Sequence, residues 1–86
     1  MKELLLFYLP SCPHCKLALQ CIETLKAENP QYAGVQIKLI DEGVEKKLAN
    51  SYDYWYVPCF WLDGKKVYEG HMEKTDVKRV LDMAIQ

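Results

Sequence analysis

Residues 11–16 read Ser-Cys-Pro-His-Cys-Lys, and they follow residues 4–9, which read Leu-Leu-Leu-Phe-Tyr-Leu. The apolar run has the length of a strand, and its unbroken hydrophobicity is typical of a central strand that is covered on both faces. From Pro13 onward apolar residues recur at helical spacing, and proline suits the first turn of a helix. Cys12 and Cys15 therefore form a Cys-x-x-Cys pair where a buried strand gives way to a helix.

The start of a helix stabilises negative charge on a sulfur. Backbone N–H groups there have no partner within the helix, and the helix dipole is positive at that end. Because the thiolate is the attacking form of a cysteine, we expect Cys12 to be the nucleophile. Cys15 lies one turn further on, and we expect it to be the more buried, resolving thiol, with Pro13 stiffening the loop between the two. The predicted chemistry is thiol–disulfide exchange through a mixed disulfide on Cys12.

His14 lies between the two cysteines. An imidazole in this position can donate a hydrogen bond to the Cys12 thiolate and, when it is protonated, add positive charge. Both effects lower the pKa of Cys12. Pairs of this type have pKa values from about 7 down to about 3.5, and a lower pKa stabilises the reduced form. We therefore expect a relatively oxidising couple, tuned by His14.

Apolar periodicity and turn residues predict the rest of the chain. Val44, Leu48 and Tyr52 fall at i, i+4 and i+8, which predicts a short helix over residues 44–51. Asp63-Gly64 is a two-residue hairpin signal. We further expect the first helix to end at Asn29-Pro30, and strands over residues 35–40, 59–62 and 65–68. A closing helix should follow, with Thr75 as its N-cap. Its apolar stripe comprises Val77, Val80, Leu81, Ala84 and Ile85.

The predicted order is β-α-β-α-β-β-α in a single α/β domain over residues 1–86. A strand, a helix and a second strand imply a right-handed crossover between parallel neighbours, and the hairpin adds antiparallel strands. The result is a small mixed four-stranded sheet with helices on both faces. With 86 residues, of which 50% are hydrophobic, the chain has the length and composition for one core.

Charge and hydropathy limit the partners. The net charge of -1 provides no cationic field for nucleic acid or for an anionic membrane. The longest apolar run is too short to span a bilayer or to form the core of a signal peptide, so we expect a cytoplasmic protein. In that reducing compartment a cysteine pair indicates redox catalysis or metal binding more often than a structural disulfide.

Two separate stretches resemble the glutaredoxin branch of the thioredoxin superfamily. Residues 7–25 are similar to its first strand, Cys-Pro-x-Cys corner and first helix, with Ser11 before the first cysteine. Residues 57–65, Val-Pro-Cys-Phe-Trp-Leu-Asp-Gly-Lys, are similar to its Val-Pro-x-x-Phe-x-x-Gly-Lys segment and hairpin. The resemblance implies a thioredoxin-like fold with a cis Pro58 and a Val57 backbone that pairs with substrate opposite Cys12. Ser11, Tyr56, Val57 and Pro58 are thus the candidate substrate-binding residues.

The sequence differs from glutaredoxins and from thioredoxins at positions where these families have typical functional residues. Leu9, Tyr56 and residues 69–73 replace three glutathione contacts that glutaredoxins commonly have. A glutathione-independent dithiol reductase acting on a protein partner is therefore favoured over a glutathione-dependent glutaredoxin. Leu6 and Ser11 stand where thioredoxins have a buried Asp and a Trp. The group that deprotonates Cys15 is left open between water, His14 and the leaving thiolate.

The remaining alternatives concern metal and packing. A Cys-x-x-Cys is also half of a zinc site, so a metal-binding or redox-sensing interaction module is the second alternative, although Cys21 and Cys59 form no second close pair. We expect Cys21 to pack in the core, Cys59 to be a secondary regulatory candidate, and His71 to be a surface residue. About half of the aromatic residues at positions 52, 54, 55 and 56 should pack, and the others should form an apolar rim for a partner peptide.

Electrons in this prediction are carried by the thiols themselves. We expect a monomer with no bound cofactor and no metal. Its substrate would be a protein disulfide or a small thiol, and a reductase or glutathione would supply the electrons.

Overall fold

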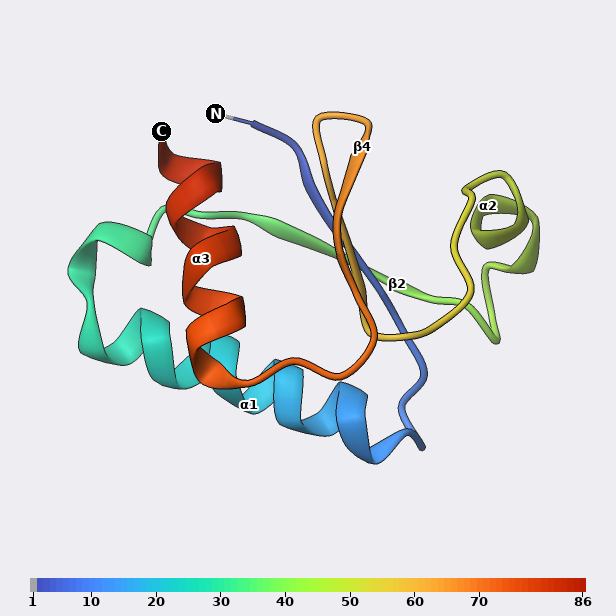
Figure 1. The fold of residues 1–86 in the computed structure, drawn as a ribbon, viewed down its shortest axis with the longest axis horizontal. Coiled ribbons are helices and arrows are strands. Elements are labelled where there is room, and N and C mark those ends of the chain that lie inside the picture. The colour runs from blue at the N-terminus through green and yellow to red at the C-terminus, as the bar shows by residue number, and fades with distance from the viewer. Residues whose placement is uncertain (1) are drawn as a thin grey trace.

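The computed structural model of the chain describes residues 2–86. Its elements are β1 (Leu4–Tyr8), α1 (Pro13–Glu28), the 3-10 turn η1 (Pro30–Tyr32), β2 (Ile37–Asp41), α2 (Lys46–Asn50), β3 (Cys59–Leu62), β4 (Lys65–Glu69) and α3 (Lys74–Ile85) (Figure 1). The predicted β-α-β-α-β-β-α order is confirmed, and η1 is the one addition to it within these residues.

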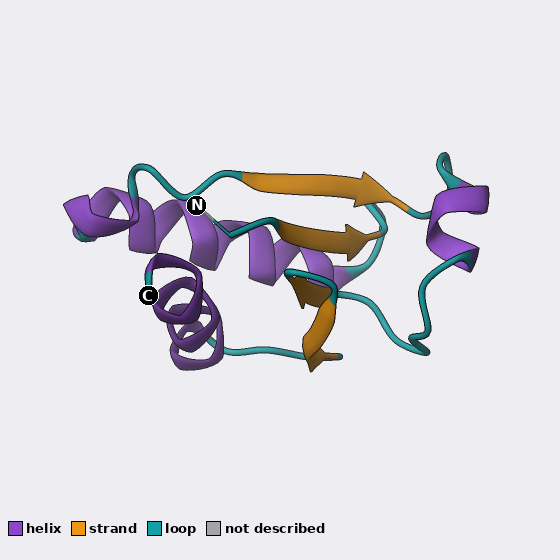
Figure 2. Cartoon of the chain, turned by 90° about the horizontal axis from the view of Figure 1, so that it is seen from above, coloured by secondary structure: helices purple, strands orange, loops and turns teal. Residues whose placement is uncertain are grey.

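The four strands form one mixed sheet in the order β2-β1-β3-β4. β1 is parallel to β2 and antiparallel to β3, and β3 is antiparallel to β4. α1 and α3 pack together on one face of the sheet, whereas the short α2 stands apart from that pair (Figure 2). The α/β class and the mixed sheet predicted from the sequence are therefore confirmed.

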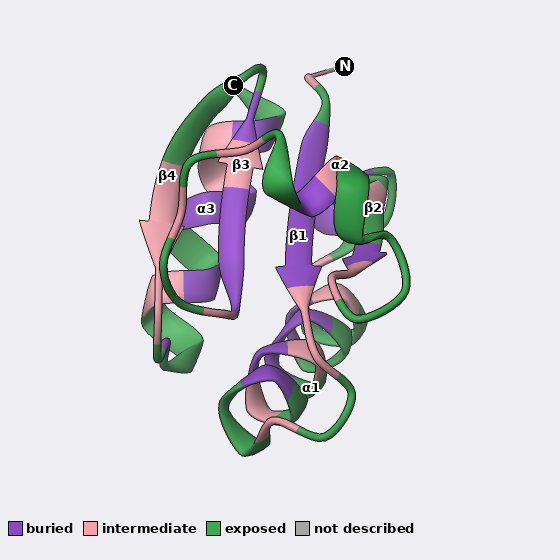
Figure 3. Cartoon of the chain, turned by 90° about the vertical axis from the view of Figure 1, so that its right-hand side faces the viewer, coloured by how far each residue is buried: buried purple, intermediate pink, exposed green. Residues whose placement is uncertain are grey.

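β1 is buried on both faces, which explains its unbroken apolar run. Leu4 and Leu6 pack with α1 and α3 in one core cluster, and Leu5 and Phe7 pack with Ala49 of α2 in a second. The central strands β1 and β3 are accordingly the most buried part of the sheet (Figure 3). Successive side chains of β1 alternate between the two clusters, so the strand is held from both faces. This fixes the point at which the turn to α1 begins after Tyr8.

The β3–β4 hairpin turns at Asp63 and Gly64, as predicted. Both residues have positive φ, 49° and 83°, which is the conformation that a two-residue type I′ turn requires. Asp63 accepts a hydrogen bond from the Glu3 N–H through its carboxylate and donates its own N–H to the Glu3 carbonyl. The hairpin is thereby tied to the start of β1.

Two predicted boundaries are wrong at the strand and helix in the middle of the chain. β2 begins at Ile37, and Val35 precedes it as a buried loop residue whose N–H bonds the Tyr32 carbonyl. α2 begins at Lys46 because residues 41–45 form a turn, in which the Val44 N–H bonds the Asp41 carbonyl. Val44 is therefore 77% exposed and takes no part in the predicted apolar stripe.

The N-cap of α3 is Glu73 and not the predicted Thr75. The Glu73 side chain accepts from the Asp76 N–H, while the Asp76 carboxylate accepts from the Glu73 N–H at 2.9 Å. This reciprocal capping box satisfies two otherwise unpaired backbone groups, which a single threonine hydroxyl would not do. The predicted stripe is buried at Val77, Val80, Leu81 and Ala84, but Ile85 at the helix end is exposed.

The two valines whose predicted positions are wrong, Val35 and Val44, give a matched test of the core. Val35→Ala should lower the free energy of unfolding by about 1–3 kcal/mol, because a side chain that is 2% exposed loses two carbon atoms from a packed site. Val44→Ala should change it by less than about 0.5 kcal/mol. Urea denaturation of the two variants measures the difference. Equal losses would contradict the assignment of Val35 to the core and of Val44 to the surface.

Candidate functional site

Cys12 is the N-cap of α1, and Pro13 is its first residue. The chain reaches this position through a tight turn after β1, in which the Cys12 N–H donates to the Leu9 carbonyl at 3.1 Å. The Cys12 carbonyl then accepts the first helical hydrogen bond, from the Lys16 N–H at 3.0 Å. The pair thus lies between a buried strand and a helix start, where the sequence predicts it.

The two thiols of the pair have opposite environments. Cys12 is partly exposed, whereas Cys15 is 1% exposed and its sulfur accepts a hydrogen bond from the Leu9 N–H at 3.4 Å. Burial raises the pKa of Cys15 to about 12, and the adjacent Cys12 adds to this rise. At neutral pH Cys15 is therefore a thiol, poised next to a sulfur that loses its proton much more readily.

The pKa of Cys12 is lowered from its ordinary value. Partial burial of Cys12 would by itself raise its pKa, but three donors outweigh that effect: the backbone N–H of Cys15, the Cys15 thiol and the backbone N–H of His14. The Cys12 side chain makes no cap hydrogen bond with the helix, and the residue stays partly exposed. The helix start stabilises the thiolate through its backbone, as the sequence indicates.

Within residues 2–86, the hydrogen bond of the His14 imidazole is to His71, whereas the sequence predicts one to Cys12. Nδ1 of His14 lies 2.8 Å from Nδ1 of His71, and the two rings meet edge to face with centroids 4.9 Å apart. Nε2 of His71 in turn contacts the carboxylate of Glu73, the N-cap of α3. His14 therefore assists Cys12 through its N–H, and its ring belongs to a surface chain of three side chains.

The prediction that His71 is only a surface residue is therefore incomplete. His71 is exposed, yet it contacts the residue between the two cysteines across 57 positions of sequence. Gly70 prepares this placement, because its φ of 93° turns the chain out of β4 in a conformation that favours glycine. No local pattern connects residues so far apart, so the sequence offered only the observation that residues 69–73 differ from the glutaredoxin pattern.

The loop before β3 lies at the same end of the sheet as the cysteine pair. Cys59 is paired with Phe7 in antiparallel register, so Pro58 lies level with the end of β1. Pro58 is buried, the Val57–Pro58 peptide bond is cis, and the Pro58 carbonyl accepts from the Gly70 N–H at 2.8 Å. Val57 is partly buried, and Ser11, directly before Cys12, is exposed.

Glu69 fastens this loop. Its carboxylate accepts from the backbone N–H groups of Trp55 and Tyr56, the latter at 2.9 Å, and from the Lys66 ammonium at 2.9 Å. The Lys66 hydrogen bond, followed by the two backbone N–H groups, lowers the pKa of Glu69 to about 2. The carboxylate is therefore charged under all ordinary conditions, and it holds the backbone of two residues whose side chains face outward.

The four aromatic residues before Pro58 divide into two pairs. Tyr52 and Tyr54 each pack on Phe7 with ring centroids 4.8 Å apart, and Tyr54 donates to the Glu42 carboxylate at 2.6 Å. Trp55 and Tyr56 are 84% and 70% exposed. The predicted division into packing and exposed residues is confirmed, and the exposed pair adjoins Val57.

The other two cysteines are buried in separate clusters. Cys21, a residue of α1, packs in the cluster that α1 and α3 form with one face of the sheet. Cys59 packs with Leu5 and Phe7 on the other face. Cys59 is 0% exposed, and burial raises its pKa to about 12. Packing of Cys21 is therefore confirmed, and Cys59 is enclosed in the core instead of lying near the rim of the site.

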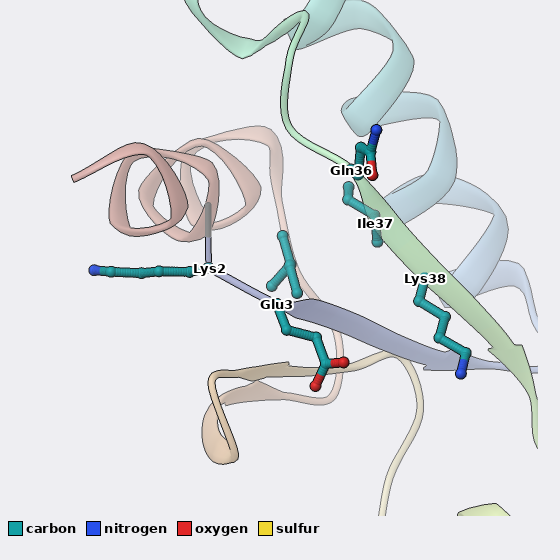
Figure 4. Close-up of a pocket in the computed structure, with 6 residues that line it drawn as sticks. Lys2, Glu3, Gln36, Ile37 and Lys38 are labelled. Carbon is teal, nitrogen blue, oxygen red and sulfur yellow. The ribbon is translucent and has the colours of Figure 1, made fainter.

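Other features of the molecule lie outside this site. Over residues 2–86, no group of three or more His, Cys, Asp or Glu side chains is arranged to hold a metal ion, and no helix has the length and hydrophobicity to cross a bilayer. A pocket of about 330 Å³ opens between the starts of β1 and β2, lined by Lys2, Glu3, Leu4, Gln36, Ile37 and Lys38 (Figure 4). It lies at the opposite end of β1 from Cys12.

The chain matches no protein-family model and no curated protein sequence. Among solved structures, a thioredoxin from Malassezia sympodialis matches with a TM-score of 0.77 and 15% identity over 99% of this chain and 76% of its own. A variant thioredoxin from Halobacterium salinarum gives 0.72 and 25% over 99% and 75%. The Drosophila melanogaster thioredoxin Deadhead gives 0.70 and 16% over 95% and 79%. The thioredoxin fold is thereby confirmed, while the narrower resemblance to glutaredoxins stays a prediction.

The difference between the thiols predicts selective labelling. With iodoacetamide at neutral pH, Cys12 should react in the reduced native protein, because its pKa is lowered and it is partly exposed. Cys15, Cys21 and Cys59 should react only after unfolding. Peptide mass mapping measures the modified positions, with urea-unfolded protein as the control. Labelling of Cys12 no faster than an ordinary peptide thiol would contradict the site.

The Glu69 contacts predict a stability difference that depends on pH. The folded pKa of about 2 lies below the unfolded value of about 4.3, so the contribution is present above about pH 4.3 and is lost as pH falls toward about 2. Glu69→Gln should therefore be less stable than the wild type at pH 7, and the gap should close with acid. Urea denaturation across pH measures it, with Glu23→Gln as the control. A gap independent of pH would overturn the role of the charge.

Proposed function

We propose that this chain is a thiol–disulfide oxidoreductase in which Cys12 attacks and Cys15 resolves. The observation that supports this most directly is the contrast between a partly exposed sulfur of lowered pKa at the start of α1 and a buried thiol with a pKa of about 12 beside it. The thioredoxin structures that resemble the chain support the same general class of reaction. Thiol–disulfide exchange needs these two kinds of sulfur and no further group.

The first step joins Cys12 to the substrate. The Cys12 thiolate attacks one sulfur of a substrate disulfide, the S–S bond breaks, and the other substrate sulfur leaves as a thiolate. Cys12 is then part of a neutral mixed disulfide. Of the causes that hold the pKa of Cys15 high, burial persists, but the hydrogen bond and the charge of Cys12 are gone. Cys15 therefore loses its proton more readily after the first step than before it.

The second step closes the active-site disulfide. The Cys15 proton passes to the departed substrate thiolate, and the Leu9 N–H already lies at the Cys15 sulfur to stabilise its negative charge. The Cys15 thiolate attacks Cys12, and the second substrate sulfur leaves and takes a proton from water. Two electrons have then moved from the cysteine pair to the substrate, with one proton supplied by Cys15 and one by water. A dithiol reductase or glutathione returns the protein to its reduced form.

A protein disulfide fits the surface beside Cys12 best. Trp55 and Tyr56 present two exposed aromatic side chains, and aromatic residues of this kind anchor protein partners. Glu69 fixes their backbone, which lowers the entropy lost when a partner binds. We assign recognition of an extended substrate segment to Val57 and Pro58, and a further contact to the exposed Ser11 before Cys12. Leu9 offers no charge to a glutathione carboxylate, which favours a protein substrate over the glutaredoxin alternative.

The net charge of the chain and the chemistry of the dithiol suggest where the protein acts. A small thiol carrier with a net charge of -1 has no feature that would hold it on nucleic acid or on a membrane. We propose that it acts as a monomer in the cytoplasm, where reductants can restore the dithiol.

Single-cysteine variants test the proposal. Cys12→Ser should reduce a protein disulfide such as that of insulin no faster than buffer with the same reductant, because the nucleophile is missing. Cys15→Ser should accumulate a mixed disulfide on Cys12, since nothing resolves it. Turbidity measures the first effect and mass spectrometry the second, with Cys59→Ser as the matched control of a buried cysteine. A Cys12→Ser variant with the wild-type rate would contradict the proposed function.

The substrate class has its own test. Reduction of a protein disulfide should be faster than reduction of a glutathione mixed disulfide at equal concentration, because the glutathione contacts are replaced. Strong activity with the glutathione mixed disulfide would instead favour the glutaredoxin alternative.

A further inference from the structure

We propose that His71 is a positioning residue for the dithiol, which holds the ring of His14 away from the Cys12 sulfur and so keeps the couple less oxidising than its Cys-Pro-His-Cys sequence implies. This inference rests on the proposed function, because it concerns the same sulfur pair. It assigns a role to a residue from outside the cysteine loop, on the connection between β4 and α3 (Figure 1).

The chain of contacts begins at a fixed point. Glu73 is locked by the reciprocal capping box at the start of α3, so its carboxylate has a defined position. Nε2 of His71 contacts that carboxylate, which fixes the plane of the His71 ring and places the proton on Nε2. Nδ1 of His71 then points at Nδ1 of His14, 2.8 Å away.

The Nδ1-to-Nδ1 contact allows only one proton between the rings. One nitrogen donates and the other accepts, so the two rings form a hydrogen bond only while one of them keeps a lone pair on Nδ1. The Glu73 carboxylate contacts the ring of His71 and not the ring of His14, so the contact between the two rings is anchored from the His71 side.

The contact competes with the interaction that the sequence predicts. The contact with His71 orients the His14 ring, and no hydrogen bond from this ring to Cys12 is present within residues 2–86. Consistent with this, the part of His14 that lowers the pKa of Cys12 is its backbone N–H. Removing the His71 ring frees the imidazole of His14 to reach the thiolate and to donate a hydrogen bond to it.

Removing His71 should therefore affect the sulfur pair in a defined direction. In His71→Ala the pKa of Cys12 should fall, because an imidazole donor is added to the backbone donors. The reduced form gains stability, so the equilibrium constant for reduction by glutathione should rise by about threefold to tenfold, or about 15–30 mV in potential. His71 lies on the surface, with 47% of its side chain exposed, so its loss should leave the fold intact.

A double-mutant cycle separates positioning from a merely structural effect. The same two quantities are measured in the wild type, His71→Ala, His14→Ala and the double variant: the pKa of Cys12 from thiolate absorbance, and the potential from glutathione redox buffers. If His71 acts through His14, the effect of His71→Ala disappears in the His14→Ala background. In His71→Asn, the side-chain amide takes the place of Nδ1, and values close to the wild type are expected. Thr75→Ala, in the first turn of α3, is the control for a nearby exposed substitution.

Two results would overturn the inference: an unchanged Cys12 pKa and potential in His71→Ala, or the same change with and without His14. Neither measurement needs a substrate protein. A wild-type chain that forms the Cys12–Cys15 disulfide but reduces no protein disulfide would therefore count against the proposed function alone. A chain that fails to form this disulfide at all would remove both.

Discussion

Backbone N–H groups at the start of α1 lower the pKa of the Cys12 thiol, and the rest of the site depends on the direction in which this helix starts. That direction is set by β1, which is buried on both faces and so cannot shift or rotate relative to the sheet. In the turn after β1, the Leu9 carbonyl accepts a hydrogen bond from the Cys12 N–H, and the Leu9 N–H donates to the Cys15 sulfur. Because backbone dipoles supply the positive potential, no cationic side chain has to be placed beside the reactive thiolate.

Three consecutive residues at the end of an edge strand bring the separate parts of the site together. The Glu69 carboxylate holds the exposed aromatic pair, the Gly70 N–H bonds the Pro58 carbonyl, and the His71 ring meets His14. Each contact reaches a different segment of the chain, so the end of β4 fixes the mutual position of the loop before β3 and the cysteine pair. These residues are also where the sequence departs from the glutaredoxin pattern. In this structure they make internal contacts with three separate segments.

The sequence predicts well what depends on neighbours along the chain. The apolar run of β1, the proline at the start of α1 and the Asp63-Gly64 turn each act locally, and each was predicted correctly. It predicts poorly what depends on contacts between distant segments. The ring of His14 turns to a residue 57 positions away, and a turn within residues 41–45 removes Val44 from its apparent stripe. The glutamate cap of α3 was missed because side chains other than Ser, Thr, Asn and Asp seldom signal an N-cap.

The placement of the His14 ring also bears on the direction of electron flow. The sequence predicts an oxidising couple because it counts the imidazole among the groups that stabilise the Cys12 thiolate. With that ring engaged by His71, the stabilisation comes from two backbone N–H groups and the Cys15 thiol, and the partial burial of Cys12 opposes it. A thiolate with fewer donors is a poorer leaving group and a less stable reduced state, so the dithiol gives up its electrons more readily. In the proposed thiol–disulfide exchange, this placement of the His14 ring favours reduction of the partner over the installation of a disulfide.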